Sequence, residues 1–455
     1  MDDMTMDGSA ASTISRRRLL GGAAALGAAA TLLPALARSG GAQAAARTLT
    51  VALDGSPSDL DPHTANDYRS EVALRGIYEN LIALKDDKTD QYDGVIAETW
   101  ESNADKSVWT FHLRAGVTFH DGSVCDAEAV RASFARMLSL GYEPALELGR
   151  FIPAADAVTA PDAKTVVFTL GKPQIFFETA MTSQYGAQIV NVKVAKANEV
   201  NKDGGHTWAQ TNAAGMGTGP YALKDYQPGI QAVLERFDGY WRGWQTDNFD
   251  PIVVRVVPET ETRRQLVESG EVDIIDRATP EALQALEKNA DVRVDKSYST
   301  ETDYLILTVA GPLKSVAARQ AMCYAFPYDD VVNGVYRGYG KRLVGPVSDV
   351  CKGHDAETFS YPTDLEKAKS LFASAGVAPG TELSVIQVSG DESIKATLQL
   401  FQANLAKIGM TLKIDTVDQT AMIGTLYRDV KPEEQPNVMP NFWWPIYNDA
   451  WDHLQ

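Results

Sequence analysis

Residues 96–136 constrain the fold more than any other part of the chain. Residues 108–115 alternate between aromatic or apolar and polar or β-branched types, a period of two that predicts a half-buried strand. A turn at residues 120–122 follows, and Asp126 stands where an N-cap would begin a helix over residues 127–138. The stretch therefore predicts a strand, a turn and a helix, and it contains no catalytic constellation.

The same stretch resembles the signature of the family 5 extracellular solute-binding proteins, which are the oligopeptide-, dipeptide- and nickel-type receptors of ABC importers. Three pieces match that signature in order, namely residues 97–101, 109–122 and 127–130. Other family-like elements occur elsewhere in the chain, at residues 59–63 (D-L-D-P-H), 78–81 (Y-E-N-L), 217–221 (G-T-G-P-Y) and 240–241 (Y-W).

This resemblance implies an α/β fold of the periplasmic binding protein type, with two lobes (class II) and an extra subdomain in the first lobe. Residues 45–88 and 213–297 would form the first lobe, 89–212 the middle subdomain and 298–455 the second lobe. In the family the chain then returns to the first lobe. Because this sequence stops at Gln455, inside a family-like segment, we expect a truncated second lobe that lacks the return.

Local patterns independently predict α/β units. An apolar run at residues 252–257 precedes a helical composition at 259–269, Gly270 stands at the C′ position, and a short strand is expected at 272–275. Strand, helix and strand at this spacing predict that the two strands pair in parallel. Thr279 and Pro280 then have the N-cap and N1 arrangement of a further helix.

A second α/β unit is predicted near the end of the chain. Thr363 and Glu366 have the spacing of a capping box for a helix over residues 364–375. A longer helix is predicted over residues 392–408, and its apolar positions recur in steps of three and four, which is typical of a core-facing stripe.

The N-terminus resembles a twin-arginine signal peptide over residues 1–44. Ser15, Arg16 and Arg17 precede an uncharged segment rich in Ala and Gly, and residues 42–44 (A-Q-A) suit a signal peptidase. A membrane anchor over residues 19–37 is the alternative. We expect export by the Tat translocase to the periplasm as a soluble protein, without a lipid anchor because no Cys follows the cleavage site.

Length, net charge and cysteine count further limit the folds and functions that the chain can have. A chain of 455 residues exceeds one ordinary core. Its net charge of −18, with no run of Lys or Arg beyond the N-terminus, argues against nucleic-acid binding. Among its three cysteines, Cys323 and Cys351 are the favoured disulfide pair because both fall in the predicted second lobe, which leaves Cys125 over.

Candidate cofactor and metal motifs fail on their spacing, so we expect neither. Glycines at 215, 217 and 219 lack the dinucleotide-loop pattern, and residues 334–341 resemble a phosphate loop, but Arg342 stands where Ser or Thr would hold magnesium. His112 and His120 have no third metal ligand near them in the sequence.

Residues 442–452 gather five aromatic residues and two carboxylates. The segment resembles the family's W-x-x-D-Y-x-D-P-D-N-F, which implies that it lines the ligand cleft between the lobes. Aromatic faces with a fixed carboxylate suit an amphipathic ligand, and an aromatic core cluster is the alternative. The expected ligand contacts here are Trp443, Trp444, Tyr447 and Asp449.

Two further contacts are expected from the first lobe, Asn66 and Tyr68, which follow the D-P turn; an ordinary exposed loop is the alternative. One departure from the family matters. In dipeptide-type relatives the first acid of the aromatic segment receives the peptide α-amino group, and Ile446 stands at the matching position. An apolar residue cannot offset the desolvation of an ammonium group, which argues against the dipeptide mode of binding.

The leading hypothesis is a monomeric periplasmic receptor of an ABC importer that binds a peptide-like or other small organic solute in an interlobe cleft and delivers it to the permease. Two alternatives are a secreted hydrolase of peptides or glycosides and a chaperone-like peptide holder. The sequence shows no G-x-S-x-G or H-E-x-x-H motif, which disfavours the hydrolase.

Overall fold

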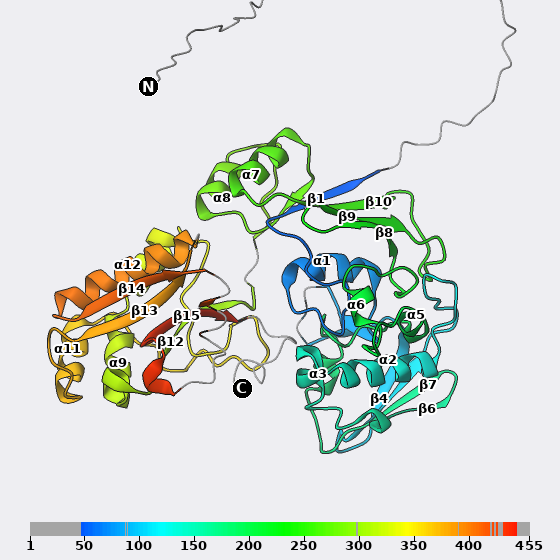
Figure 1. Ribbon diagram of the computed structural model, residues 1–455, viewed down its shortest axis with the longest axis horizontal. Coiled ribbons are helices and arrows are strands. Elements are labelled where there is room, and N and C mark those ends of the chain that lie inside the picture. The colour runs from blue at the N-terminus through cyan, green and yellow to red at the C-terminus, as the bar shows by residue number, and fades with distance from the viewer. Residues whose placement is uncertain are drawn as a thin grey trace, which may run out of the picture. The chain divides into compact units, whose positions relative to one another are not determined.

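The chain forms two lobes, each with a hydrophobic core of its own. One core consists of side chains between Leu60 and Leu234, and the other of side chains between Leu313 and Val438. Both lobes combine helices with sheets (Figure 1), so the predicted α/β class is confirmed. The computed structural model describes residues 47–86, 88, 90–296, 299–389, 391–418, 421–422, 425 and 431–443.

The first lobe is built on a five-stranded sheet in the order β11-β1-β10-β9-β8. Strand β1 lies between β10 and β11 and is parallel to both, so the two predicted strands run parallel but each pairs with β1, and their predicted pairing with each other is wrong. Strand β9 is antiparallel to β10 and to β8. The bounds are β1 Leu49–Leu53, β8 Tyr221–Gln227, β9 Gln231–Arg236, β10 Pro251–Val256 and β11 Ile274–Ile275.

The helices of this lobe begin and end at the residues that local chemistry favours. Gly270 ends α7 with a left-handed φ of 74°, as predicted. The Thr279 side chain accepts a hydrogen bond from the Ala282 amide, and Pro280 occupies the first helical position of α8, also as predicted. The helices are α1 Tyr68–Ile77, α7 Thr260–Ser269 and α8 Pro280–Leu286.

The chain between β1 and β8 builds an antiparallel sheet in the order β4-β5-β7-β6, against which α2 packs. The predicted strand is β5, Val108–Leu113, two residues shorter than expected, and α2 is Ala127–Leu140, capped by Asp126 as predicted. The remaining elements are β2 Ile82–Leu84, β3 Tyr92–Gly94, β4 Ala97–Ser102, β6 Val158–Asp162, β7 Thr165–Thr169, α3 Glu143–Leu148, α4 Phe177–Ala180, α5 Val192–Ala197, α6 His206–Ala209 and the 3-10 turn Ala155–Ala157.

The second lobe is built on a four-stranded sheet in the order β12-β15-β13-β14. Strand β12 is antiparallel to β15, and β13 is parallel to β14 and β15. The elements are β12 Thr302–Leu307, β13 Glu382–Val388, β14 Thr411–Val417, β15 Val438–Trp443, α9 Val316–Ala325, α10 Tyr328–Asp330, α11 Leu365–Ser374, α12 Glu392–Lys407, the π-helical turn Val331–Val335, and the 3-10 turns Gly311–Leu313 and Pro432–Glu434.

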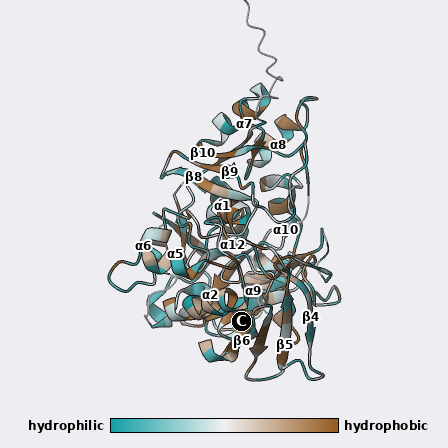
Figure 2. Cartoon of the chain, turned by 90° about the vertical axis from the view of Figure 1, so that its right-hand side faces the viewer, coloured by the Kyte–Doolittle hydropathy of each residue, from teal (hydrophilic) through white to brown (hydrophobic). Residues whose placement is uncertain are grey.

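The predicted apolar stripe of α12 is confirmed, because Leu398, Phe401 and Leu405 are buried in the second core. Helices with both hydrophilic and hydrophobic residues are visible in Figure 2, as expected where one side packs on a core. The predicted capping box of α11 is wrong. Asp364 caps that helix by accepting from the Lys367 amide, while the Thr363 hydroxyl donates to the Phe326 carbonyl instead.

Two further observations bear on the predicted organisation. No disulfide bond joins Cys125, Cys323 and Cys351, so the expected Cys323–Cys351 bridge is not formed in the structure. Within the described residues, no helix has the length and apolar character needed to cross a membrane.

A hydrogen-bond cluster around Glu79 connects three of the family-like elements. The buried Glu79 carboxylate accepts from the Thr218 hydroxyl, the Tyr240 hydroxyl and the Trp241 indole N–H. Gly217 approaches the end of α1 so closely that an added Cβ would lie 1.9 Å from the Ile77 carbonyl oxygen. These motif residues therefore serve the packing of the first lobe.

A buried ion pair joins the D-P turn to α2. Asp61 is fully buried and accepts from Arg136 at 2.5 and 2.9 Å. His63 contributes its Nδ1 to the Arg136 guanidinium at 2.9 Å, and His206 lies 3.5 Å from the Asp61 carboxylate. Burial alone would raise the pKa of Asp61, but the hydrogen bonds from His206 and Arg136 outweigh it and lower that pKa. The pair is thus ionised in the folded protein.

Replacing Arg136 should be costly. Arg136→Met would leave Asp61 as a buried charge without its cation, which should lower the free energy of unfolding by about 3–5 kcal/mol. The matched control is Arg131→Met on the same helix, which breaks the exposed Arg131–Glu128 pair and should cost at most about 1 kcal/mol. Urea unfolding measures both, and equal losses would contradict a special role for the buried pair.

His63 should make stability depend on pH. Burial, aided by the charge of Arg136, lowers the pKa of His63 to about 3. The unfolded chain binds a proton at this residue below about pH 6.5, whereas the folded chain does not. Stability is therefore retained above pH 6.5 and falls toward pH 3, with a slope of about 1.4 kcal/mol per pH unit. Measured by urea unfolding between those pH values, the free energy of unfolding of His63→Gln should depend on pH less steeply than that of the unaltered protein, by this slope. Parallel pH profiles of the two proteins would contradict the assignment.

Candidate functional site

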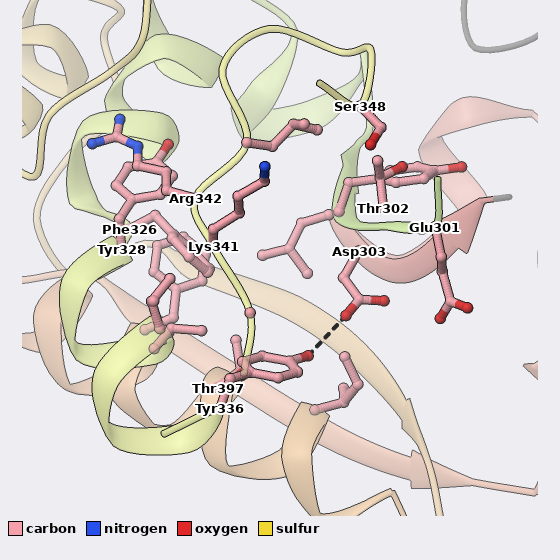
Figure 3. Close-up of a pocket in the computed structure, with 18 of the residues that line it drawn as sticks. Glu301, Thr302, Asp303, Phe326, Tyr328, Tyr336, Lys341, Arg342, Ser348 and Thr397 are labelled. Carbon is pink, nitrogen blue, oxygen red and sulfur yellow. Dashed lines mark hydrogen bonds between the residues drawn. The ribbon is translucent and has the colours of Figure 1, made fainter. Parts of the chain in front are cut away.

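The second lobe contains a cavity of about 490 Å³ (Figure 3). Every residue that lines it lies between Ser299 and Phe401. The lining comes from strand β12, the end of helix α9, the segment 328–349 and helix α12. In the described part of the chain the cavity therefore lies within the second lobe, whereas the sequence predicted a binding site in a cleft between the two lobes.

Aromatic side chains form one wall of the cavity. Helix α9 ends at Ala325 because Pro327 cannot continue it, and this places Phe326 in an extended conformation. The Phe326 ring meets Tyr328 and Phe401 edge to face, with ring centres 5.0 and 5.2 Å apart. The Arg342 guanidinium lies 4.0 Å from the centre of the Tyr328 ring. These contacts fix a rigid, largely apolar surface.

A π-helical turn shapes the opposite part of the lining. It spans Val331–Val335, and the amide of Tyr336 closes it on the Val331 carbonyl. Arg337 and Gly338 follow with left-handed φ values of 52° and 82°, which reverse the chain. The Arg337 side chain is held by an ion pair with Glu281 at 2.6 Å. Single π-helical turns occur frequently at functional sites.

Three carboxylates line the cavity, and each has a different partner. Glu301 forms an ion pair with Arg277 at 3.1 Å. Asp349 forms one with Lys341. Asp303 accepts a hydrogen bond of 2.9 Å from the Tyr336 hydroxyl, as Figure 3 shows.

The environment of Asp303 disfavours its charge. Burial raises the pKa of the Asp303 carboxyl, and the negative charges of Glu301 and Asp391 raise it further. The hydrogen bond from Tyr336 and the charge of Arg277 oppose this without reversing it. The Tyr336 hydroxyl in turn has a raised pKa, first because of burial and then because of the Asp303 charge, so it remains a donor.

The two residues expected from the first lobe, Asn66 and Tyr68, differ in their relation to the cavity. Tyr68 lies beneath Arg277, whose guanidinium is 3.9 Å from the ring centre, and the same guanidinium pairs with Glu301 at the cavity. Tyr68 is thus linked to the cavity lining through one side chain. Asn66 instead donates a hydrogen bond to Glu143 and does not line the cavity.

Trp443 ends strand β15 opposite Thr302, which lines the cavity, and its backbone carbonyl accepts from the Thr302 hydroxyl. Its own side chain is not part of the lining. The other expected contacts, Trp444, Tyr447 and Asp449, lie outside the described residues, as does Ile446.

Sequence analysis missed the contribution of residues 336–342. This segment was compared only with a phosphate loop, whereas Tyr336, Tyr339, Lys341 and Arg342 all line the cavity. A usable signal was present, since two tyrosines and two adjacent cations sit beside two glycines, a mixture typical of ligand-binding loops rather than of the core.

The described residues contain no group of three or more His, Cys, Asp or Glu side chains that could hold a metal ion. The two histidines considered from the sequence have other surroundings. His120 donates from Nε2 to the Gly219 carbonyl at 2.9 Å, and His112 lies 3.9 Å from Glu101 on the exposed face of the β4–β5 pair.

Two α/β lobes with separate cores and a ligand-sized cavity fit the architecture of the periplasmic binding proteins. The model of the bacterial extracellular solute-binding proteins, family 5 (middle part), matches residues 91–455. The chain belongs to this family. It is therefore a solute receptor of the kind that serves ABC importers, and neither the hydrolase nor the chaperone alternative is favoured.

Individual relatives and a solved structure agree with this family assignment. The probable D,D-dipeptide-binding periplasmic protein DdpA of Escherichia coli K12 is 30% identical over 408 residues, covering 89% of this chain and 76% of that protein. The dipeptide-binding protein of the same strain is 26% identical, over 87% of this chain and 75% of that protein. The periplasmic binding protein DppA of Helicobacter pylori, solved with the peptide STSA, superposes with a TM-score of 0.76 at 25% identity, covering 90% and 80% of the two chains.

Proposed function

We propose that this receptor binds a peptide-like or other small organic solute in the cavity of its second lobe and delivers it to an ABC permease. The observation that carries the proposal is the cavity itself. Its volume of about 490 Å³ falls within the range of small-molecule sites, and it combines an aromatic wall with a few fixed charged groups. That combination suits a solute with an apolar body and polar ends.

The relatives support a peptide-like solute, since the names of DdpA and of the dipeptide-binding protein refer to dipeptides and DppA was solved with a tetrapeptide. The proposal includes export by the Tat translocase, guided by Arg16 and Arg17, and action in the periplasm as a monomer without a lipid anchor. Asn66, Tyr68, Trp443, Trp444, Tyr447 and Asp449 remain proposed contacts of the closed, ligand-bound protein.

Filling the cavity should abolish binding. Ile394 lines the cavity from α12, so Ile394→Trp would occupy the space that the solute needs. Lys395→Trp is the matched control, because the neighbouring Lys395 side chain is 45% exposed and does not line the cavity. We expect calorimetric binding of di- to tetrapeptides by the unaltered chain and by Lys395→Trp, and at least about a tenfold loss for Ile394→Trp.

Thermal melts of the same proteins check that they fold. A solute at a hundred times its Kd should stabilise the two binding-competent proteins by about 2.7 kcal/mol. Normal binding by a well-folded Ile394→Trp would place the site elsewhere.

Trp444 and Asp449 should act on the solute as a stacking face and as a charged or hydrogen-bonding partner. Trp444→Ala and Asp449→Asn should each weaken binding by about 1–3 kcal/mol, with a smaller change in stability. If the aromatic segment is core instead, Trp444→Ala should cost about 3–5 kcal/mol of stability. Calorimetry and thermal melts of both variants separate these outcomes.

A further inference from the structure

The carboxylates of the cavity differ in how their charge is offset. Glu301 and Asp349 each face a cation, Arg277 and Lys341 respectively. Asp303 forms no ion pair with any described residue, and its hydrogen-bond donor is the neutral Tyr336 hydroxyl. Asp303 is therefore the carboxylate of the cavity lining that pairs with no cation among the described residues.

Such a charge is costly where water is displaced. A carboxylate that leaves water needs a cation or several donors, and one hydroxyl supplies a single donor. Burial raises the pKa of the Asp303 carboxyl, and the negative charges of Glu301 and Asp391 raise it further, so a cation beside Asp303 would favour its charged form. Asp303 is nevertheless open to the cavity rather than packed away, so a bound group can reach it.

A second, independent feature points to a polar ligand group in the same cavity. Thr397 lines the cavity from α12 and is only 6% exposed, yet its Oγ1 has no hydrogen-bond partner among the described residues. Helix α12 packs against the π-helical turn Val331–Val335, which directly precedes Tyr336, the residue that donates a hydrogen bond to Asp303. A buried hydroxyl without a partner costs free energy unless a ligand supplies one.

We propose that Asp303 receives a protonated amine of the solute, with Thr397 as a further hydrogen-bond partner. This inference rests on the proposed function and adds to it the chemical class of the solute, a small amphipathic molecule with a free ammonium group. An ammonium group has three donors, so it can serve a carboxylate and a hydroxyl together. The ring of Tyr336 and the aromatic wall offer the apolar body of such a solute a surface that also tolerates a cation.

Asp303 also supplies a carboxylate that can receive an ammonium group, which the residue at position 446 cannot. The aliphatic Ile446 has no group that could accept a proton or face an ammonium. Strand β12 is far from residue 446 in sequence, but it is hydrogen-bonded to β15, the strand that leads into the aromatic segment. An amine acceptor on β12 therefore lies on the strand beside β15, from which the chain continues into the aromatic segment.

The test compares free and blocked amines on the full-length chain freed of co-purified solute. The probes are L-Ala-L-Ala, D-Ala-D-Ala and the tetrapeptide Ser-Thr-Ser-Ala, each also in its N-acetyl form, measured by calorimetry. The unaltered chain should prefer the free amine by about tenfold to a hundredfold, the usual value of a charge-assisted hydrogen bond. Asp303→Asn should reduce this preference to less than about threefold, because its amide still accepts from Tyr336 but carries no charge.

Asp349→Asn is the matched control, since it removes a carboxylate of the same cavity that already faces Lys341. It should keep the preference for the free amine. Preference retained by a well-folded Asp303→Asn, or equal binding of free and acetylated probes by the unaltered chain, would overturn the role of Asp303 while leaving a peptide receptor intact. Failure of every probe to bind would reject the peptide-like solute itself and this inference with it. Equal binding of free and acetylated probes by the unaltered chain overturns the inference even if Asp303→Asn does not fold.

Discussion

The first lobe depends on the buried Asp61–Arg136 ion pair, because this pair ties the turn between β1 and α1 to helix α2, which packs on the inserted sheet. Taking both charges out of water is costly, and the pair is compatible with folding only because the remaining polar atoms are also used. His63 and the Gly204 carbonyl both bond to the Arg136 guanidinium. The Glu79 cluster provides a second connection of the same kind, between the end of α1 and the returning chain. The carboxylates of Asp61 and Glu79 are both acceptors surrounded by donors, so neither residue can be exchanged freely for another type.

The cavity of the second lobe lies at one edge of its sheet. The core of this lobe is apolar, and its sheet brings β12 beside β15, strands more than 130 residues apart in sequence. In the described part of the chain, β12 pairs with β15 on one side and is the edge of the sheet on the other. An edge strand has backbone and side chains that no further strand covers, so it can line a ligand site. The π-helical turn and the left-handed residues after it place Tyr336 against this edge.

Elements with local causes could be predicted from the sequence, whereas the cavity could not. The Asp126 cap and the stripe of α12 follow from neighbouring residues and from helical periodicity, and both are confirmed. The capping box of α11 failed because a tertiary acceptor, the Phe326 carbonyl, takes the Thr363 hydroxyl. Asp303 and Tyr336 are 33 positions apart in the sequence. Their contact depends on a π-helical turn, which no sequence periodicity predicts. Family resemblance gave the fold and the class of function, but it directed attention to residues 442–452 and away from residues 336–342.

The arrangement of charges in the cavity explains how a receptor of a widespread fold can acquire its own selectivity. Glu301 and Asp349 are already neutralised by protein cations, so a neutral solute can replace water beside them at little electrostatic cost. Beside Asp303 the same replacement leaves a carboxylate with a single neutral donor. Sites that bury an unsatisfied polar group reject ligands lacking the complementary group far more strongly than apolar sites reject a ligand of the wrong size. Selectivity here would come less from added attraction than from the penalty that Asp303 imposes on solutes without a cation. One substitution on an edge strand can set such a penalty without changing either core, which allows relatives with the same architecture to differ in the solutes they bind.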